Sequence, residues 1–117
     1  MLKDFLYKRV SGTADSATVR LLPECPVYQA HFPGFPITPG VTLVQMAAEL
    51  IGLPLKSAKD IKFVAPVFPN AEGGPLLRFQ WQLQEDGKAD ISVYLNGETL
   101  CAKMQCFMEL PDPESLT

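Results

Sequence analysis

The sequence contains one histidine, His31, which opens the segment HFPGFPITPGVTLVQMAAE at residues 31–49. An imidazole can transfer protons near neutral pH, but acid–base catalysis usually needs a second polar group on the other side of the substrate. Downstream, an apolar run carries one amide, Gln45, and one carboxylate, Glu49. The candidate chemistry is therefore proton transfer by His31, with Gln45, Glu49 or neither as its partner.

The backbone between the histidine and the apolar run is irregular. Pro33, Gly34, Pro36, Pro39 and Gly40 fall within eight residues. If a helix begins directly after them, its free N–H groups can bind an anion or polarise a carbonyl, as in an oxyanion site. The alternative is that the prolines only shape a turn.

The elements that must position these residues can be predicted from periodicity. From Val41 to Leu50 the chain is apolar almost all round, which predicts a helix that is buried on most faces. Pro39 suits the first turn of this helix, and Gly52 suits its C-terminal end.

Strands are predicted before and after this helix. LLRFQWQLQ (76–84) places Leu77, Phe79, Trp81 and Leu83 on one side, and DISVYLN (90–96) alternates in the same way. The dipeptides Asp86-Gly87 and Asn96-Gly97 supply the positive φ angles of tight hairpins. We therefore expect an antiparallel meander of strands near 75–84, 89–95 and 98–109, with another pair in FLYKRVSG and ATVRLLP and one more strand in DIKFVAPV.

Length and composition limit the possible classes of protein. The chain has 117 residues, and a formal charge of −3 argues against nucleic acid or an anionic membrane as the main partner. No apolar run is long enough to span a bilayer, and the first residues do not resemble a secretory signal, so a cytoplasmic location is expected. The three cysteines lack metal-ligand spacing, so we expect free thiols and no metal. We predict one domain at 1–110 and a flexible tail at 111–117.

A resemblance to a known family rests on the motif HFPGFPITPGV. This segment resembles the signature of the β-hydroxyacyl-acyl-carrier-protein dehydratases, which are hot-dog-fold enzymes of fatty-acid synthesis. The similarity extends through LLPECPVYQA, IKFVAPVFPNAE and VYLNGETLCAKMQCFME, and so covers roughly residues 17 to 109.

The resemblance implies a fold, an activity and partners. The fold is an α+β hot-dog fold, an antiparallel sheet wrapped around one long central helix. The activity is that of a hydro-lyase, which converts a 3-hydroxyacyl thioester to the trans-2-enoyl thioester in fatty-acid or related lipid or polyene synthesis. No cofactor is implied, because the substrate is carried on the phosphopantetheine of acyl carrier protein or on CoA. The family also implies a homodimer or a higher homo-oligomer of dimers.

Residue roles follow from the family only where the motif matches. His31 matches the base that removes a proton from the carbon next to the thioester, and the amides of Gly40 and Val41 match the contacts to the thioester oxygen. In the family each site takes its histidine from one subunit and its acid from the other. Further residues of the loop are candidates for substrate binding: Phe32, Phe35 and Pro36.

The chain departs from the family at the acid. The family has a carboxylic acid fourteen residues after the histidine, and that position is Gln45, whose amide cannot give a proton to a leaving hydroxide. Four residues on, where the family commonly has glutamine, stands Glu49. Residues four apart share a helix face, so Glu49 could replace the acid, and the apolar helix would favour its protonated form. The alternatives are that His31 acts mostly alone or that the site is not catalytic.

Two other functions remain open. Many hot-dog proteins are thioesterases that use a carboxylate to activate water, and Glu49 could serve in that role. A catalytically silent acyl-carrier-binding subunit, which keeps the loop but lacks the acid, would explain Gln45.

Overall fold

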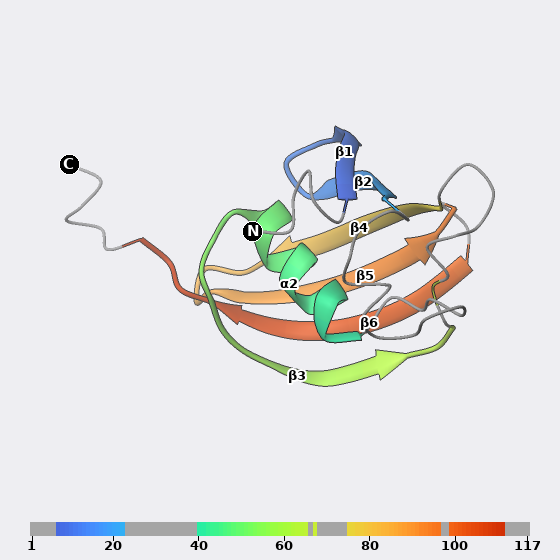
Figure 1. Cartoon of the computed structure of the whole chain (residues 1–117). Coiled ribbons are helices and arrows are strands. Elements are labelled where there is room, and N and C mark those ends of the chain that lie inside the picture. Colours follow the sequence, from blue (N-terminus) through green and yellow to red (C-terminus); the bar gives the residue numbers. More distant parts are fainter. Residues whose placement is uncertain (1–6, 23–39, 66, 68–74, 97–98, 112–117) are drawn as a thin grey trace.

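The computed structural model describes residues 7–22, 40–65, 67, 75–96 and 99–111, which form one antiparallel sheet and one helix (Figure 1). The predicted bounds of the domain and of its tail remain a prediction, because residues 1–6 and 112–117 lie outside this range. The elements are β1 (Tyr7–Gly12), β2 (Ser16–Leu21), α2 (Gly40–Ile51), β3 (Leu55–Phe63), β4 (Leu76–Leu83), β5 (Lys88–Leu95) and β6 (Thr99–Met108).

The six strands follow the order β1-β2-β4-β5-β6-β3, and every neighbouring pair is antiparallel. Strands β1 and β3 therefore form the two edges of the sheet. The sheet curves around α2, which lies across one face (Figure 1). This arrangement confirms the prediction of an antiparallel sheet wrapped around one helix.

The core lies between the helix and the face of the sheet that it covers. Alternate residues of β2, β4 and β5 are buried, as the period-two patterns predict. Leu83 is the exception: it is 42% exposed because it ends β4, opposite Ala89 beside the hairpin turn. The largest fully buried side chains are those of Tyr7, Phe79, Leu21, Met46, Leu77, Met108, Val19, Val67 and Val93.

The meander of β4, β5 and β6 confirms the predicted strands to within one or two residues. Gly87 has a φ of 94° and Asn96 a φ of 53°, so both turns use the positive angles that the sequence predicts. Asp86 does not share this conformation. Instead its carboxylate accepts a hydrogen bond from the backbone N–H of Lys88 (3.0 Å) and so stabilises the turn.

Helix α2 begins and ends where the sequence predicts. It starts at Gly40 and ends at Ile51, and Gly52 follows with a φ of 85° while its N–H donates to the carbonyl of Ala48 (2.9 Å). This left-handed glycine is a common end of a helix. At 12 residues, α2 is the one helix in the described part of the chain, where no helix is long and apolar enough to cross a membrane.

Strand β3 corrects one prediction. The sequence predicts a strand in residues 60–67, but the strand spans Leu55–Phe63 and so begins five residues earlier. It is an edge strand that pairs only with β6, and its register shifts at two bulges, so most of its side chains face solvent. An exposed, bulged edge strand has no regular alternation of apolar and polar residues, and the pattern that predicts strands is therefore missing.

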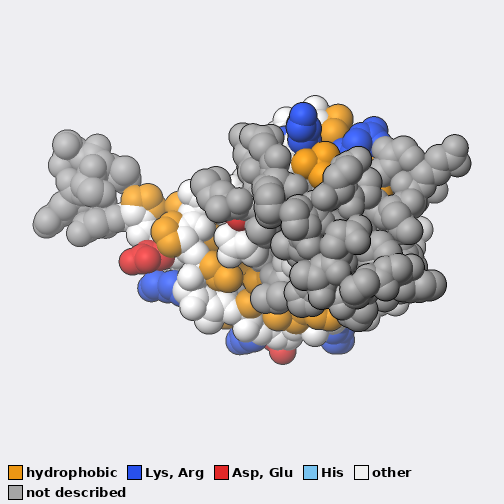
Figure 2. Space-filling view, viewed as in Figure 1, with side chains coloured by type: hydrophobic (Ala, Val, Ile, Leu, Met, Phe, Trp, Pro, Cys, Tyr) orange, Lys and Arg blue, Asp and Glu red, His pale blue; other side chains and the backbone are white. Residues whose placement is uncertain are grey.

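Charged side chains of both signs occur on the surface. Lys and Arg side chains gather over β1 and β2, where Lys8, Arg9 and Arg20 are exposed (Figure 2). Strand β3 carries three lysines and one acidic residue, Asp60.

Candidate active site

The carboxylate of Glu49 is held by two hydrogen bonds. The hydroxyl of Tyr7 donates to its Oε1 oxygen across 3.1 Å, and the Nε2 amide of Gln45 donates to its Oε2 oxygen across 3.0 Å. Glu49 and Gln45 lie one turn apart on α2, whereas Tyr7 comes from the edge strand β1. Both oxygens of the carboxylate thus accept a hydrogen bond from a described residue.

These three residues differ in exposure, which gives the group an inner and an outer side. Tyr7 is 1% exposed, Glu49 is half-buried and Gln45 is exposed. A buried tyrosine usually finds a partner for its hydroxyl, and here that partner is the carboxylate. Glu49 therefore lies at the boundary between core and surface, where its charged end can meet a ligand.

A pocket of about 240 Å³ opens beside this carboxylate, at the C-terminal end of α2. Gln45 and Glu49 form its polar side, and the loop into β3 forms an apolar wall. We call it the helix-end pocket; its lining residues are Gln45, Ala48, Glu49, Gly52, Leu53, Pro54 and Leu55. Such a pocket can take a small apolar group next to a hydrogen-bond acceptor.

The structure places only some of the predicted site residues. Gly40 and Val41 are the first two residues of α2, as predicted, and backbone N–H groups at this position of a helix have no partner within the helix. Gln45 and Glu49 are in contact, as their spacing predicts. The loop residues His31, Phe32, Phe35 and Pro36 lie outside the described residues, so their roles, and the distance from His31 to Glu49, remain predictions.

Tyr7 is the member of this site that the sequence analysis missed. It precedes the helix by 33 residues and belongs to a segment with no motif. The available signal was weak: a tyrosine in a predicted strand, whose hydroxyl would need a partner if the side chain were buried.

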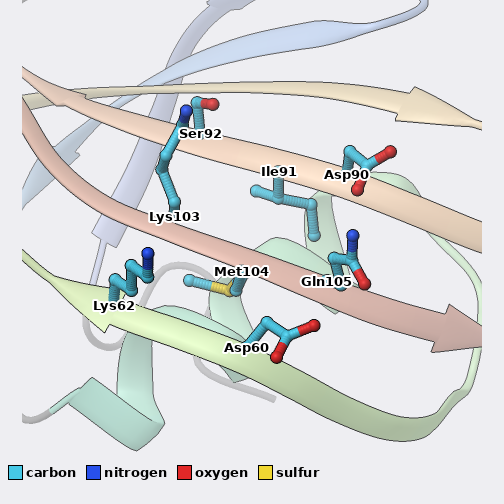
Figure 3. A pocket seen from close by; sticks show the side chains of 8 residues that line it. All are labelled: Asp60, Lys62, Asp90, Ile91, Ser92, Lys103, Met104 and Gln105. Atoms are coloured by element: carbon cyan, nitrogen blue, oxygen red, sulfur yellow. The ribbon is translucent and has the colours of Figure 1, made fainter.

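A second hollow, of about 360 Å³, lies on the face of the sheet opposite α2 (Figure 3). Its charged side chains come from three strands and balance in sign: Asp60, Lys62, Asp90 and Lys103. Ser92 and Gln105 add neutral polar groups. Because this outer hollow is on the far side of the sheet from Glu49, it cannot share a substrate with that carboxylate.

Two thiols are buried in the core. Cys101 and Cys106 of β6 are free and have no exposed surface, and burial raises the pKa of each thiol. Raised values make them poor nucleophiles near neutral pH. Within the described ranges, no group of three or more His, Cys, Asp or Glu side chains could hold a metal ion.

Solved structures place this architecture in a known class. The dehydratase domain from the CurK module of curacin polyketide synthase aligns with a TM-score of 0.60 and 15% identity, over 97% of this chain and 47% of that one. The dehydratase heterocomplex ApeI:P from Xenorhabdus doucetiae aligns with a TM-score of 0.56 and 14% identity, over 96% and 86%. At such low identity these likenesses establish the fold alone: the domain has the hot-dog fold.

Sequence comparison identifies the family. The family model described as ApeI-like, ApeI dehydratase, matches residues 8–105, and the chain belongs to this family. The 3-hydroxyacyl-[acyl-carrier-protein] dehydratase FabZ of Caldicellulosiruptor saccharolyticus is 29% identical over 89 residues, which cover 65% of this chain. The matched part spans 64% of that relative, less than two thirds of its length. These matches confirm the resemblance to the 3-hydroxyacyl-acyl-carrier-protein dehydratases.

Proposed function

We propose that the protein is a hydro-lyase that removes water from a 3-hydroxyacyl thioester to give the trans-2-enoyl thioester. The observation that carries this proposal is the Glu49 carboxylate, held by Tyr7 and Gln45 beside the helix-end pocket in a member of a dehydratase family. A carboxylate has about four acceptor sites, so Glu49 can accept a hydrogen bond from the substrate hydroxyl in addition to those from Tyr7 and Gln45.

In the proposed reaction His31 removes a proton from C2 of the acyl group. The electron pair of the C2–H bond forms the C2=C3 double bond, and the C3–O bond breaks. The N–H groups of Gly40 and Val41, at the start of α2, stabilise the charge that develops on the thioester oxygen. Glu49 of the other subunit holds the hydroxyl in position, and the proton taken up by His31 leaves with it as water, so the enzyme returns to its starting state.

The proposal includes the carrier and the assembly. A phosphopantetheine thioester on acyl carrier protein is the expected substrate, with CoA as the simpler alternative; the names of the FabZ relatives support this choice. A homodimer in the cytoplasm is also part of the proposal. The solved heterocomplex ApeI:P supports keeping an unlike partner subunit as the alternative to a second copy of this chain.

A second candidate function is hydrolysis of the thioester. A carboxylate that Tyr7 and Gln45 hold in position would also suit the activation of water. Release of free thiol from an acyl thioester, lost in the Glu49→Gln variant, would favour hydrolysis, whereas formation of an enoyl product without thiol release favours dehydration.

The purified protein, incubated with 3-hydroxyacyl thioesters of acyl carrier protein and of CoA, tests the proposal, with the enoyl product followed by mass spectrometry. We expect turnover, and we expect His31→Ala to lower kcat by about 10²- to 10⁴-fold, the usual worth of a general base. Lys103→Ala, in the outer hollow, is the control and should keep full activity. Turnover that is unaffected by His31→Ala would overturn the mechanism.

Absence of turnover has a distinct meaning when the carrier still binds. An acylated carrier that co-purifies with an inactive homo-oligomer would support the silent-subunit alternative. Efficient turnover by this chain alone would exclude it.

A further inference from the structure

Tyr7 links the edge strand β1 to the helix that carries the proposed site. Its hydroxyl donates to Glu49 Oε1 across 3.1 Å, between residues that are 42 positions apart in the chain. The tyrosine pairs with Leu21 of β2, and both side chains are fully buried. The ring therefore sits in a fixed place, and its hydroxyl is a fixed point for the carboxylate.

The other donor to the carboxylate is less firmly held. Gln45 is exposed, and its side chain has three rotatable bonds, so it gives the carboxylate a partner without fixing where that partner stands. The side chain of Glu49 also has three rotatable bonds, so it needs a fixed partner to hold its carboxylate in one place. Compared with Gln45, Tyr7 is firmly fixed by the core, so its hydroxyl can determine where the carboxylate points.

We infer that Tyr7 is a positioning residue, which holds the Glu49 carboxylate in the orientation that the dehydration requires. This inference rests on the proposed function. It assigns a role in the reaction to the edge strand β1, outside the histidine loop and the helix that carry the family motif.

The alternative is that Tyr7 serves only to pack the core. Both roles predict some loss of stability when the side chain is cut back, so stability alone does not separate them. They differ in coupling: a positioning residue acts through Glu49, so its effect disappears when Glu49 has already been replaced.

The test is a double-mutant cycle with Tyr7→Phe and Glu49→Gln. Tyr7→Phe removes only the hydroxyl, and we expect it to lower kcat by about 10- to 100-fold, as for the loss of a hydrogen bond to a charged group, while KM changes less than about threefold. In the Glu49→Gln background the same change should have no further effect. An equal loss in both backgrounds, or no loss in either, would overturn the inference.

The chain offers a matched control. Tyr94 lies on β5, where the guanidinium of Arg78 stacks over its ring at 4.6 Å, and it has no contact with Glu49. Tyr94→Phe makes the same chemical change and should leave kcat unchanged within about twofold.

A measurement without turnover separates this inference from the proposed function. Infrared spectra of the protein labelled with ¹³C-glutamate contain a Glu49 carboxylate band, identified as the band lost in Glu49→Gln. We expect Tyr7→Phe to shift this band and Tyr94→Phe to leave it in place. If the protein turns over no thioester, the proposed function fails, and the band still decides whether Tyr7 holds the carboxylate: an unshifted band overturns the inference.

Discussion

The hydroxyl of Tyr7 and the carboxylate of Glu49 are joined across 3.1 Å, which ties the edge strand of the sheet to the third turn of its helix. Gln45 completes the group from the exposed side. Position 45, which the resemblance assigns to the acid of the dehydratase family, thus holds a donor to the carboxylate of Glu49 one turn further along. Residues four apart on a helix are neighbours whether or not the two side chains have been interchanged, so the interchange remains a prediction.

Reversing the interchange is the first test. The double variant Gln45→Glu/Glu49→Gln restores the family order while it keeps one amide and one carboxylate one turn apart. We expect it to retain at least about a tenth of the wild-type kcat, because the carboxylate moves by one turn along the same helix face. The measurement is kcat with a 3-hydroxyacyl carrier substrate.

The single variant Gln45→Glu is the control for the reversal. It places two carboxylates at i and i+4 and removes one donor, so we expect a loss of stability of about 0.2–0.5 kcal/mol from repulsion between like charges. A double variant that is less active than both single variants would contradict the idea that the two positions are interchangeable.

Subunit mixing tests whether the proposed site is shared between two copies of the chain. His31→Ala and Glu49→Gln are each expected to be nearly inactive. If the histidine of one subunit works with the glutamate of the other, mixed dimers contain one intact site, and refolding the two variants together should restore roughly a quarter of the wild-type activity. Activity no higher than that of the separate variants would show that both residues act within one subunit.

Two glycines with positive φ should differ in their tolerance of a side chain. At Gly87 a Cβ atom would clash with the carbonyl oxygen of Met108, whose N–H also donates to Gly87 (2.8 Å) and holds the backbone in place. Gly87→Ala should therefore lower the free energy of unfolding by about 2–4 kcal/mol. The measurement is urea denaturation.

Gly52→Ala is the matched control for that change. Gly52 has a similar φ, 85°, but nothing lies within 4 Å of the added Cβ. Only the strain of the left-handed conformation remains, so the loss should be about 1 kcal/mol. Equal losses at the two positions would mean that the contact with Met108 does not matter.

The buried thiols predict a pH dependence of stability. Burial raises the pKa of Cys101 and of Cys106 above the value that each has in the unfolded chain. Their contribution to stability is therefore complete below about pH 8.5, the ordinary pKa of a thiol. It is lost as the pH rises above this value, because the unfolded chain then ionises its thiols more readily than the folded protein does.

Alkylation checks the same thiols directly. In a Cys25→Ser background, iodoacetamide at pH 8 should modify the folded protein far more slowly than the urea-unfolded protein, since the reactive form is the thiolate. Two results together would contradict the burial of these side chains. The folded protein would be modified rapidly, and the urea concentration at the unfolding midpoint would not decrease as the pH is raised from 8 to 10.

Much of the fold could be predicted because local patterns agree with the tertiary structure. The alternation in β4 and β5, the turns at Gly87 and Asn96, and the apolar helix ending at Gly52 all appear where periodicity places them. Strand β3 could not be predicted correctly, because an edge strand paired on one side has no buried face that its sequence must encode.

The candidate site was predictable only in part, for a similar reason. The contact of Gln45 with Glu49 follows from helical spacing, which a sequence displays directly. The contact with Tyr7 depends on how β1 sits against α2, and no local pattern encodes a pairing over 42 residues.

The most direct test of the account is the kcat of Glu49→Gln with a 3-hydroxyacyl-acyl-carrier-protein substrate, compared with Gln45→Ala in the same assay. We predict that Glu49→Gln lowers kcat by about 10²-fold or more, because the substrate hydroxyl is no longer held in position, while Gln45→Ala, which removes only one donor to the carboxylate, lowers it by about tenfold. Unchanged turnover in Glu49→Gln would contradict the account, because the carboxylate held by Tyr7 and Gln45 would then have no part in the reaction.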